Sequence, residues 1–185
     1  PVVLDDRHGP VAVYGVPYLE PDAVRADLGC DDRSHHAVLG AALGAVRADL
    51  ARRSTTRSVV LAHAFVTGAE ACDSERDISV GGVSSVPASV FSGVDYAALG
   101  HLHGAQRVTD RVRYSGSPLP YSFSEAAHTK GMLLVELGQA VGDVAQVETV
   151  AVPQRRALSR LTGRLDDLLT HDRWEPVRDH YLQVT

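Results

Sequence analysis

Two short, continuous apolar runs constrain the fold of this chain most strongly. They cover residues 57–62 (RSVVLA) and 94–99 (VDYAAL), and each is too short for a typical buried helix. A run without polar alternation predicts a strand that is covered on both faces of a sheet. Residues 34–53 lie upstream and have the apolar period of a helix, with Ser34 as its N-cap. Strands and a helix in this order predict an α/β fold.

The remaining pattern predicts two units of unequal length. After Pro153 the pattern of apolar and polar residues changes. We expect a strand at 158–161, a short helix ending near Leu169 and a strand at 181–184. We therefore predict an α/β unit at residues 1–152 and the beginning of an α+β unit at residues 153–185. Within the first unit we expect shorter elements, namely strands at 11–14, 106–109, 111–114, 132–137 and 144–150 and a helical turn at 87–91.

Composition excludes several classes of protein. The 185 residues carry a formal net charge of −5, which disfavours a module that binds nucleic acid by bulk positive charge. No apolar run approaches the roughly 20 residues of a membrane span. The only cysteines are Cys30 and Cys72, without metal-ligand spacing, which is typical of a reducing compartment. These features predict a cytoplasmic protein without a membrane partner.

Three of the nine histidines stand where a ligand site is expected. His63 follows the first apolar run directly, and His101 and His103 follow the second within the sequence GHLHG. Ligand sites of open α/β sheets form beyond the carboxyl ends of the strands, and imidazole binds divalent metals. The spacing of His101 and His103 places both rings on one side of an extended backbone. The alternative to a ligand role is that these histidines are hydrogen-bonded within the core. We expect the other pair, at residues 35–36, to face solvent.

The sequence around these histidines resembles the calcineurin-like metallophosphoesterases and, within them, the SbcD-type DNA repair nuclease subunits. Residues 94–106 (VDYAALGHLHGAQ) and 112–125 (VRYSGSPLPYSFSE) carry the resemblance, together with residues 62–63 and 73–82. The resemblance implies a partial metallophosphoesterase sandwich, with mixed sheets flanked by helices, at residues 1–152. Residues 153–185 would then be the start of the capping domain.

The resemblance also implies a two-metal DNA phosphodiesterase that uses Mn²⁺, two ions per complete site. His63 and His101 would bind one ion and His103 the other, while the turn at residues 116–118 would lie near the site. The implied partners are DNA, the ATPase subunit SbcC and, for the complete subunit, a second copy of itself. Residues at the DNA or phosphate rim would be Arg76, Arg107, Arg113, Ser117 and Lys130.

The chain departs from this family in one respect that concerns activity. It contains no Asn, so the family's Gly-Asn-His motif, which supplies a metal ligand and the histidine for the leaving group, is absent. We therefore expect no complete catalytic set, at most one weakly held ion, no nuclease activity of the chain alone, and an exposed strand edge. The alternatives are an enzyme acting on small phosphate esters, a non-catalytic module that contacts DNA or a partner, and a zinc site made by the three histidines alone.

Overall fold

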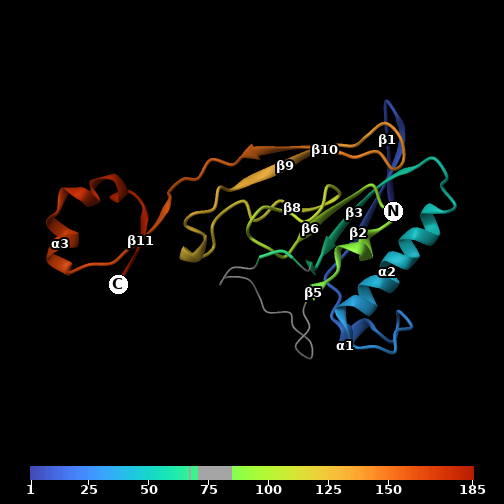
Figure 1. The fold of residues 1–185 in the computed structure, drawn as a ribbon, viewed down its shortest axis with the longest axis horizontal. Coiled ribbons are helices and arrows are strands. Elements are labelled where there is room, and N and C mark those ends of the chain that lie inside the picture. The colour runs from blue at the N-terminus through green and yellow to red at the C-terminus, as the bar shows by residue number, and fades with distance from the viewer. Residues whose placement is uncertain (67, 71–84) are drawn as a thin grey trace.

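A six-stranded mixed sheet forms the centre of the molecule (Figure 1). The computed structural model describes residues 1–66, 68–70 and 85–185. The inner strands β2, β3, β6 and β8 run parallel to their neighbours, whereas β1 and β7 pair antiparallel at the two edges. In sheet order the strands are β1 (Val2–Asp6), β2 (Gly9–Val16), β3 (Arg57–His63), β6 (Tyr96–Gly100), β8 (Val112–Tyr114) and β7 (Gln106–Arg107).

One face of the sheet is covered by α2 (His35–Leu50), as the helical period predicts. Ser34 caps this helix by accepting a hydrogen bond from the Ala37 N–H, and Leu39, Leu43 and Val46 are buried in the core beneath it. The short elements on this side are α1 (Pro21–Val24), β4 (Phe65–Val66), β5 (Ser85–Val86) and the 3-10 helix η1 (Ala88–Phe91). The expected helical turn at 87–91 is confirmed.

The opposite face is covered less completely, and this corrects one expectation. Figure 1 shows the hairpin of β9 (Gly131–Glu136) and β10 (Gln146–Ala151) on the side away from α2. Buried Arg57 ties the hairpin to the sheet by donating to the Gly138 carbonyl at 3.1 Å. Leu61 in β3 nevertheless remains 49% exposed. The prediction that β3 is covered on both faces is therefore wrong at this end.

The sheet has an exposed edge at β1, as expected, although the sequence pattern did not predict this strand. Val2, Val3 and Leu4 are exposed along it. A tight turn at Gly9, with φ 104°, joins β1 to β2. Strand β1 is paired with β2 alone, and all five of its residues are exposed. Its sequence therefore lacks the alternation of apolar and polar residues that would predict a strand.

Residues 158–185 form a small unit at one end of the molecule (Figure 1). The expected strands are confirmed as β11 (Leu158–Leu161) and β12 (Tyr181–Val184), which pair in parallel. Between them lie α3 (Leu165–Thr170) and the 3-10 helix η3 (Asp172–Val177). Strand β11 packs against the 3-10 helix η2 (Phe123–Glu125), which precedes β9. The chain is thus mixed α/β, and the predicted boundary at residues 152–153 lies in the link between β10 and β11.

No helix in the described ranges has the length and apolar character needed to cross a membrane.

Candidate functional site

The carboxyl ends of β3 and β6 bring His63 and His101 together. His63 pairs in register with Gly100, so the two strands deliver these histidines side by side. Their ring centroids lie 5.3 Å apart, with the ring planes at 73°. A Cβ atom at Gly100 would lie 3.3 Å from His63 Nδ1, so glycine leaves the room that the His63 ring needs. This juxtaposition agrees with the expected site at the ends of the parallel strands.

The backbone at His101 is strained. Its φ of 112° makes it the one non-glycine residue with positive φ in the described part of the chain. Such a conformation costs on the order of 1–3 kcal/mol and persists only where the surroundings impose it. It also turns the chain between His101 and His103, so the alternation of side chains along an extended strand does not apply here.

Aromatic rings surround the His63–His101 pair. The Tyr18 ring lies 5.9 Å from His63, and the Phe65 ring lies 6.0 Å from His101. Tyr18 also lies 5.7 Å from His35, which is only 8% exposed. Partial burial lowers the pKa of His63 below its ordinary 6.5, so its imidazole is neutral near pH 7. A neutral imidazole can act as a ligand, because one ring nitrogen keeps its lone pair.

The burial of His35 corrects the expectation that the pair at residues 35–36 faces solvent. His35 begins α2 and, together with His63, lines a small cleft under Phe65 and Val86, whereas His36 is exposed. His35 lies three and four residues before the buried Val38 and Leu39, so the helical period places it on the buried face of α2 and turns His36 away from it.

His103 has different neighbours from His101. Its Nδ1 atom lies 3.1 Å from Glu125 Oε1, and its ring centroid lies 5.3 Å from that of Tyr121. The backbone is not extended at His101, so the common side expected for the rings of His101 and His103 stays a prediction. Glu125 is fully buried in η2, and no pattern in the sequence singles it out as a site residue.

The motif residues downstream hold the histidine loops by direct contacts. The Ser117 N–H donates to the His103 carbonyl at 3.1 Å, which places the turn at 116–118 against the His103 loop. The Tyr114 hydroxyl donates to the Ala64 carbonyl at 2.7 Å and accepts from the Val66 N–H at 2.9 Å, directly after His63. Gln106 in turn binds both the N–H and the carbonyl of Glu70.

The residues predicted at the DNA or phosphate rim differ in their exposure to solvent. Lys130 is 3% exposed and donates to Glu125, Ser117 and the His103 carbonyl, so its ammonium is not presented to a phosphate at the surface. Ser117 is also buried, and Arg107 is exposed and pairs with Asp110. Arg113 is half-buried, and its Nε atom has no hydrogen-bond partner among the described residues. Arg76 lies outside the described residues, as does the motif segment 73–82.

The described residues do not by themselves make a metal centre. Within the described ranges, no three His, Cys, Asp or Glu side chains gather in a group that could hold a metal ion. Among the described residues, His63 and His101 approach each other, and the ring of His103 contacts Glu125. A metal site at these strand ends needs further ligands.

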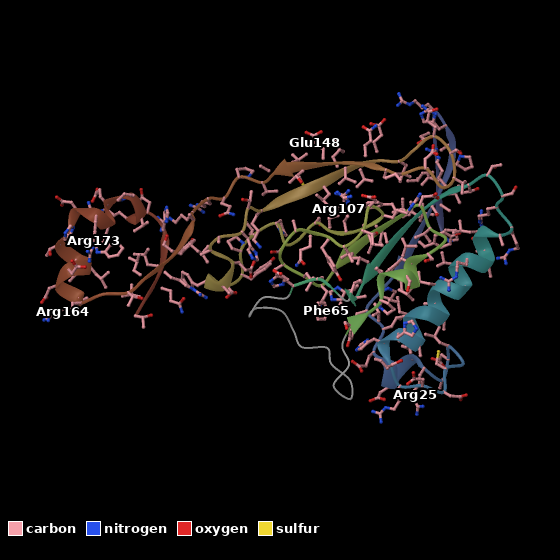
Figure 2. All side chains as sticks on the ribbon, in the orientation of Figure 1. Arg25, Phe65, Arg107, Glu148, Arg164 and Arg173 are labelled. Carbon is pink, nitrogen blue, oxygen red and sulfur yellow. The ribbon has the colours of Figure 1, made fainter. Side chains whose placement is uncertain are left out.

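Comparison of the sequence with protein-family models gives no match. The conclusions about function therefore depend on the motif resemblance, on the His63–His101 pair, and on the Glu125 network behind His103. Phe65 lies near the middle of the molecule, and Arg164 and Arg173 mark the distant end of the small C-terminal unit (Figure 2). The candidate site thus belongs to the sheet and not to that end of the molecule.

Proposed function

We propose that this chain is part of an SbcD-type subunit of a Mn²⁺-dependent DNA nuclease that hydrolyses phosphodiester bonds. The observation that carries the proposal is the close approach of His63 and His101, whose rings are 5.3 Å apart at the carboxyl ends of adjacent parallel strands. Two imidazoles placed there by glycine and by a strained backbone suit a ligand site better than a packing role.

The contacts among the motif residues support the same proposal. The segments 100–106 and 112–118 belong to one motif in the resemblance, and Ser117 binds the backbone of His103 directly. Tyr114 holds the chain after His63 in the same way. The motif segments 100–106 and 112–118 are therefore packed around the same histidines.

We further propose that the chain alone is inactive. The three histidines do not gather into a complete metal group in the described residues, and the sequence has no Asn for the family's leaving-group motif. A complete centre, with two Mn²⁺ ions, takes carboxylate ligands that these histidines do not supply. DNA, the SbcC ATPase subunit and a second copy of the complete subunit are the proposed partners, in the cytoplasm.

Manganese binding to the purified chain tests this proposal. Mn²⁺ is titrated into the wild-type protein and into the variants His63→Gln, His101→Gln and His36→Gln, with free Mn²⁺ followed by electron paramagnetic resonance. We expect at most one weakly bound ion, lost in the first two variants and retained in His36→Gln, since His36 is exposed on α2. Linear duplex DNA incubated with the chain and Mn²⁺ should remain intact.

The other outcomes favour different proteins. Release of nitrophenol from bis(p-nitrophenyl) phosphate, without cleavage of DNA, would indicate an enzyme for small phosphate esters. Binding of Zn²⁺ that requires all three histidines, without Mn²⁺ binding, would indicate a mononuclear zinc site. No binding of either ion would contradict the metal proposal and favour a non-catalytic module.

A further inference from the structure

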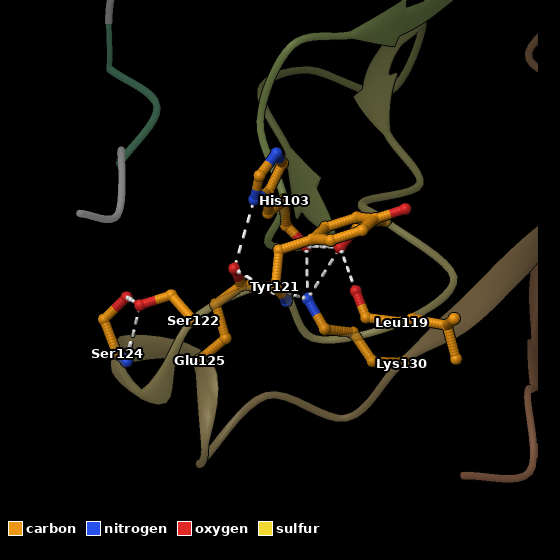
Figure 3. A network of polar contacts seen from close by, with 8 residues as sticks. His103, Leu119, Tyr121, Ser122, Ser124, Glu125 and Lys130 are labelled. Carbon is orange, nitrogen blue, oxygen red and sulfur yellow. Dashed lines mark hydrogen bonds and ion pairs between the residues drawn. The ribbon is translucent and has the colours of Figure 1, made fainter. Parts of the chain in front are cut away.

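A buried polar network lies directly behind His103 (Figure 3). Glu125 and Lys130 form its centre, with side chains 0% and 2% exposed and a distance of 2.5 Å between Oε2 and Nζ. An ion pair this deeply buried is costly unless its remaining hydrogen-bonding atoms are satisfied. Here the other Glu125 oxygen, Oε1, accepts from the Tyr121 N–H at 3.2 Å and lies 3.1 Å from His103 Nδ1. The carboxylate thus uses both oxygens, and one of them contacts His103.

These contacts determine the tautomer of His103. A carboxylate paired with an ammonium group only accepts hydrogen bonds. His103 Nδ1 must therefore carry the hydrogen and donate it to Glu125 Oε1. In the neutral ring, the lone pair then resides on Nε2, on the other side of the imidazole from Glu125.

Lys130 holds the main chain of His103 as well. Its ammonium donates to the His103 carbonyl at 2.9 Å and to Ser117 Oγ at 2.9 Å, besides Glu125. All three donors of the ammonium are thereby used. The same cation holds the backbone of His103 directly and its ring through Glu125, so a turn of the ring breaks its contact with Glu125.

We propose that Glu125, held by Lys130, is a positioning residue that fixes the ring of His103 in the Nδ1–H tautomer and makes Nε2 its ligand-binding nitrogen. The inference rests on the proposed function only for the nature of the ligand that Nε2 binds. It predicts a role for the segment 121–130 that the sequence motifs do not assign, and it replaces the predicted rim contact of Lys130 with an internal role. Removal of the Glu125 carboxylate should change the ring of His103 and not only the stability of the fold.

Long-range ¹H–¹⁵N correlation spectra of the chain labelled on the histidine rings test this proposal. Spectra are recorded at about pH 8, above the ordinary histidine pKa of about 6.5, so that the rings are neutral. His103→Gln assigns the His103 signals. We expect wild-type His103 to be in the Nδ1–H tautomer. The Nε2–H tautomer, or a mixture of the two, in the wild-type protein would overturn the proposal without the need for any variant at Glu125.

Glu125→Gln is the informative variant. Lys130 can only donate, so it takes the amide oxygen, and the NH₂ group then faces His103 Nδ1 as a donor. We expect His103 to switch to the Nε2–H tautomer. Ser124→Ala, on the same 3-10 helix, should leave the tautomer unchanged, since the Ser124 hydroxyl bonds to the hydroxyl of Ser122 at 2.9 Å. A Glu125→Gln protein that is folded, as judged by amide dispersion, and keeps the wild-type tautomer would contradict the positioning role.

Addition of Mn²⁺ to the labelled wild-type protein separates this inference from the proposed function. Paramagnetic broadening of His63 and His101 with the Nδ1–H tautomer at His103 would support both. The expected tautomer without broadening of any histidine would contradict metal binding by this chain and leave the positioning role supported. Broadening together with the wrong tautomer at His103 would contradict the positioning role alone.

Discussion

His103 and the His63–His101 pair lie at or after the carboxyl ends of the neighbouring strands β3 and β6, but they are held in different ways. His103 is fixed by polar contacts from Glu125, Lys130 and Ser117, two of which are buried ionic groups. His63 and His101 are placed by strand register, by a glycine at position 100 and by a left-handed backbone at His101. The Tyr18 ring also packs near His63, and the Phe65 ring packs near His101.

This difference shows two routes to a preorganised site. A buried ionic network specifies both the direction and the hydrogen position of a ring, but leaves a costly charge if one member is lost. A strained backbone specifies direction alone and costs free energy in the folded state whether or not a ligand is present. Loss of one member of the network should therefore destabilise the fold, whereas relief of the strain at His101 should recover part of the free energy that the strained backbone costs.

Loss of the Lys130 cation should have the largest effect. Lys130→Met leaves the fully buried Glu125 carboxylate without its partner, and we expect the free energy of unfolding to fall by about 3–5 kcal/mol. Urea unfolding followed by circular dichroism measures it. The double variant Glu125→Gln with Lys130→Met should be less destabilised than Lys130→Met, because no buried charge remains.

A surface pair is the matched control for this prediction. Arg107→Met removes the cation from the exposed Arg107–Asp110 pair, and we expect a change within about 1 kcal/mol. Equal losses for Lys130→Met and Arg107→Met would contradict the importance that we assign to burial of the network.

Gly116 tests how closely the downstream turn is packed on His103. A Cβ atom there would lie 2.7 Å from the His103 carbonyl oxygen, and φ is +77°. We expect Gly116→Ala to destabilise the protein by about 2–4 kcal/mol, from left-handed strain and overpacking together. Gly142→Ala is the control, since φ is +87° with nothing within 4 Å, and should cost only about 1–2 kcal/mol. Thermal unfolding measures the stability of both variants. Similar losses of stability in Gly116→Ala and Gly142→Ala would mean that the close approach of Gly116 to His103 is unimportant.

Relief of the backbone strain at His101 should recover stability. His101→Ala keeps the unfavourable φ of 112° and loses the ring, whereas His101→Gly loses the ring and the strain. We expect His101→Gly to be more stable than His101→Ala by about 1–2 kcal/mol, with both variants deficient in the proposed Mn²⁺ binding. Denaturant unfolding of the two variants measures this difference. The reverse order would show that the backbone at His101 is unstrained.

The sequence predicted those features that depend on local pattern. The apolar runs ending at Ala62 and Leu99 are strands, and Ser34 caps the helix whose period was recognised. Strand β1 was not predicted, because its side chains are exposed and its pairing depends on β2.

At the site, the sequence predicted the meeting of His63 with His101 but not the network behind His103. Glu125 and Lys130 contact each other across the end of η2 and the turn before β9, which no helical or strand period relates. A lysine in a polar loop is usually at the surface, so the burial of Lys130 depends on tertiary partners that one sequence does not reveal. The burial of His35, in contrast, follows from the helical period, because His35 lies three and four residues before the buried Val38 and Leu39.

Asp49 lies outside the candidate site, and its lowered pKa makes the free energy of unfolding depend on pH. Asp49 in α2 accepts hydrogen bonds from Arg53 at 2.7 Å and from the Tyr14 hydroxyl at 2.8 Å. The Arg53 contact, followed by that of Tyr14, lowers the pKa of Asp49 from 3.8 to about 2. Because the folded pKa lies below the unfolded one, the stabilisation is fully present above pH 3.8 and is lost as the pH falls to about 2.

We therefore expect wild type and Asp49→Asn to converge in stability over this pH range, with the wild type the more stable at neutral pH. Unfolding by urea at a series of pH values from about 6 to 2 measures the difference between them. Tyr14→Phe should reduce the change in the free energy of unfolding over this pH range but not abolish it. The hydrogen bond from Arg53, which is the larger cause of the lowered Asp49 pKa, remains in this variant. A constant difference between wild type and Asp49→Asn across the range would show that Asp49 is not held as an anion. Unlike the network behind His103, this contact is formed at the edge of the core, where solvent screens it, so its effect should be the smallest of the four.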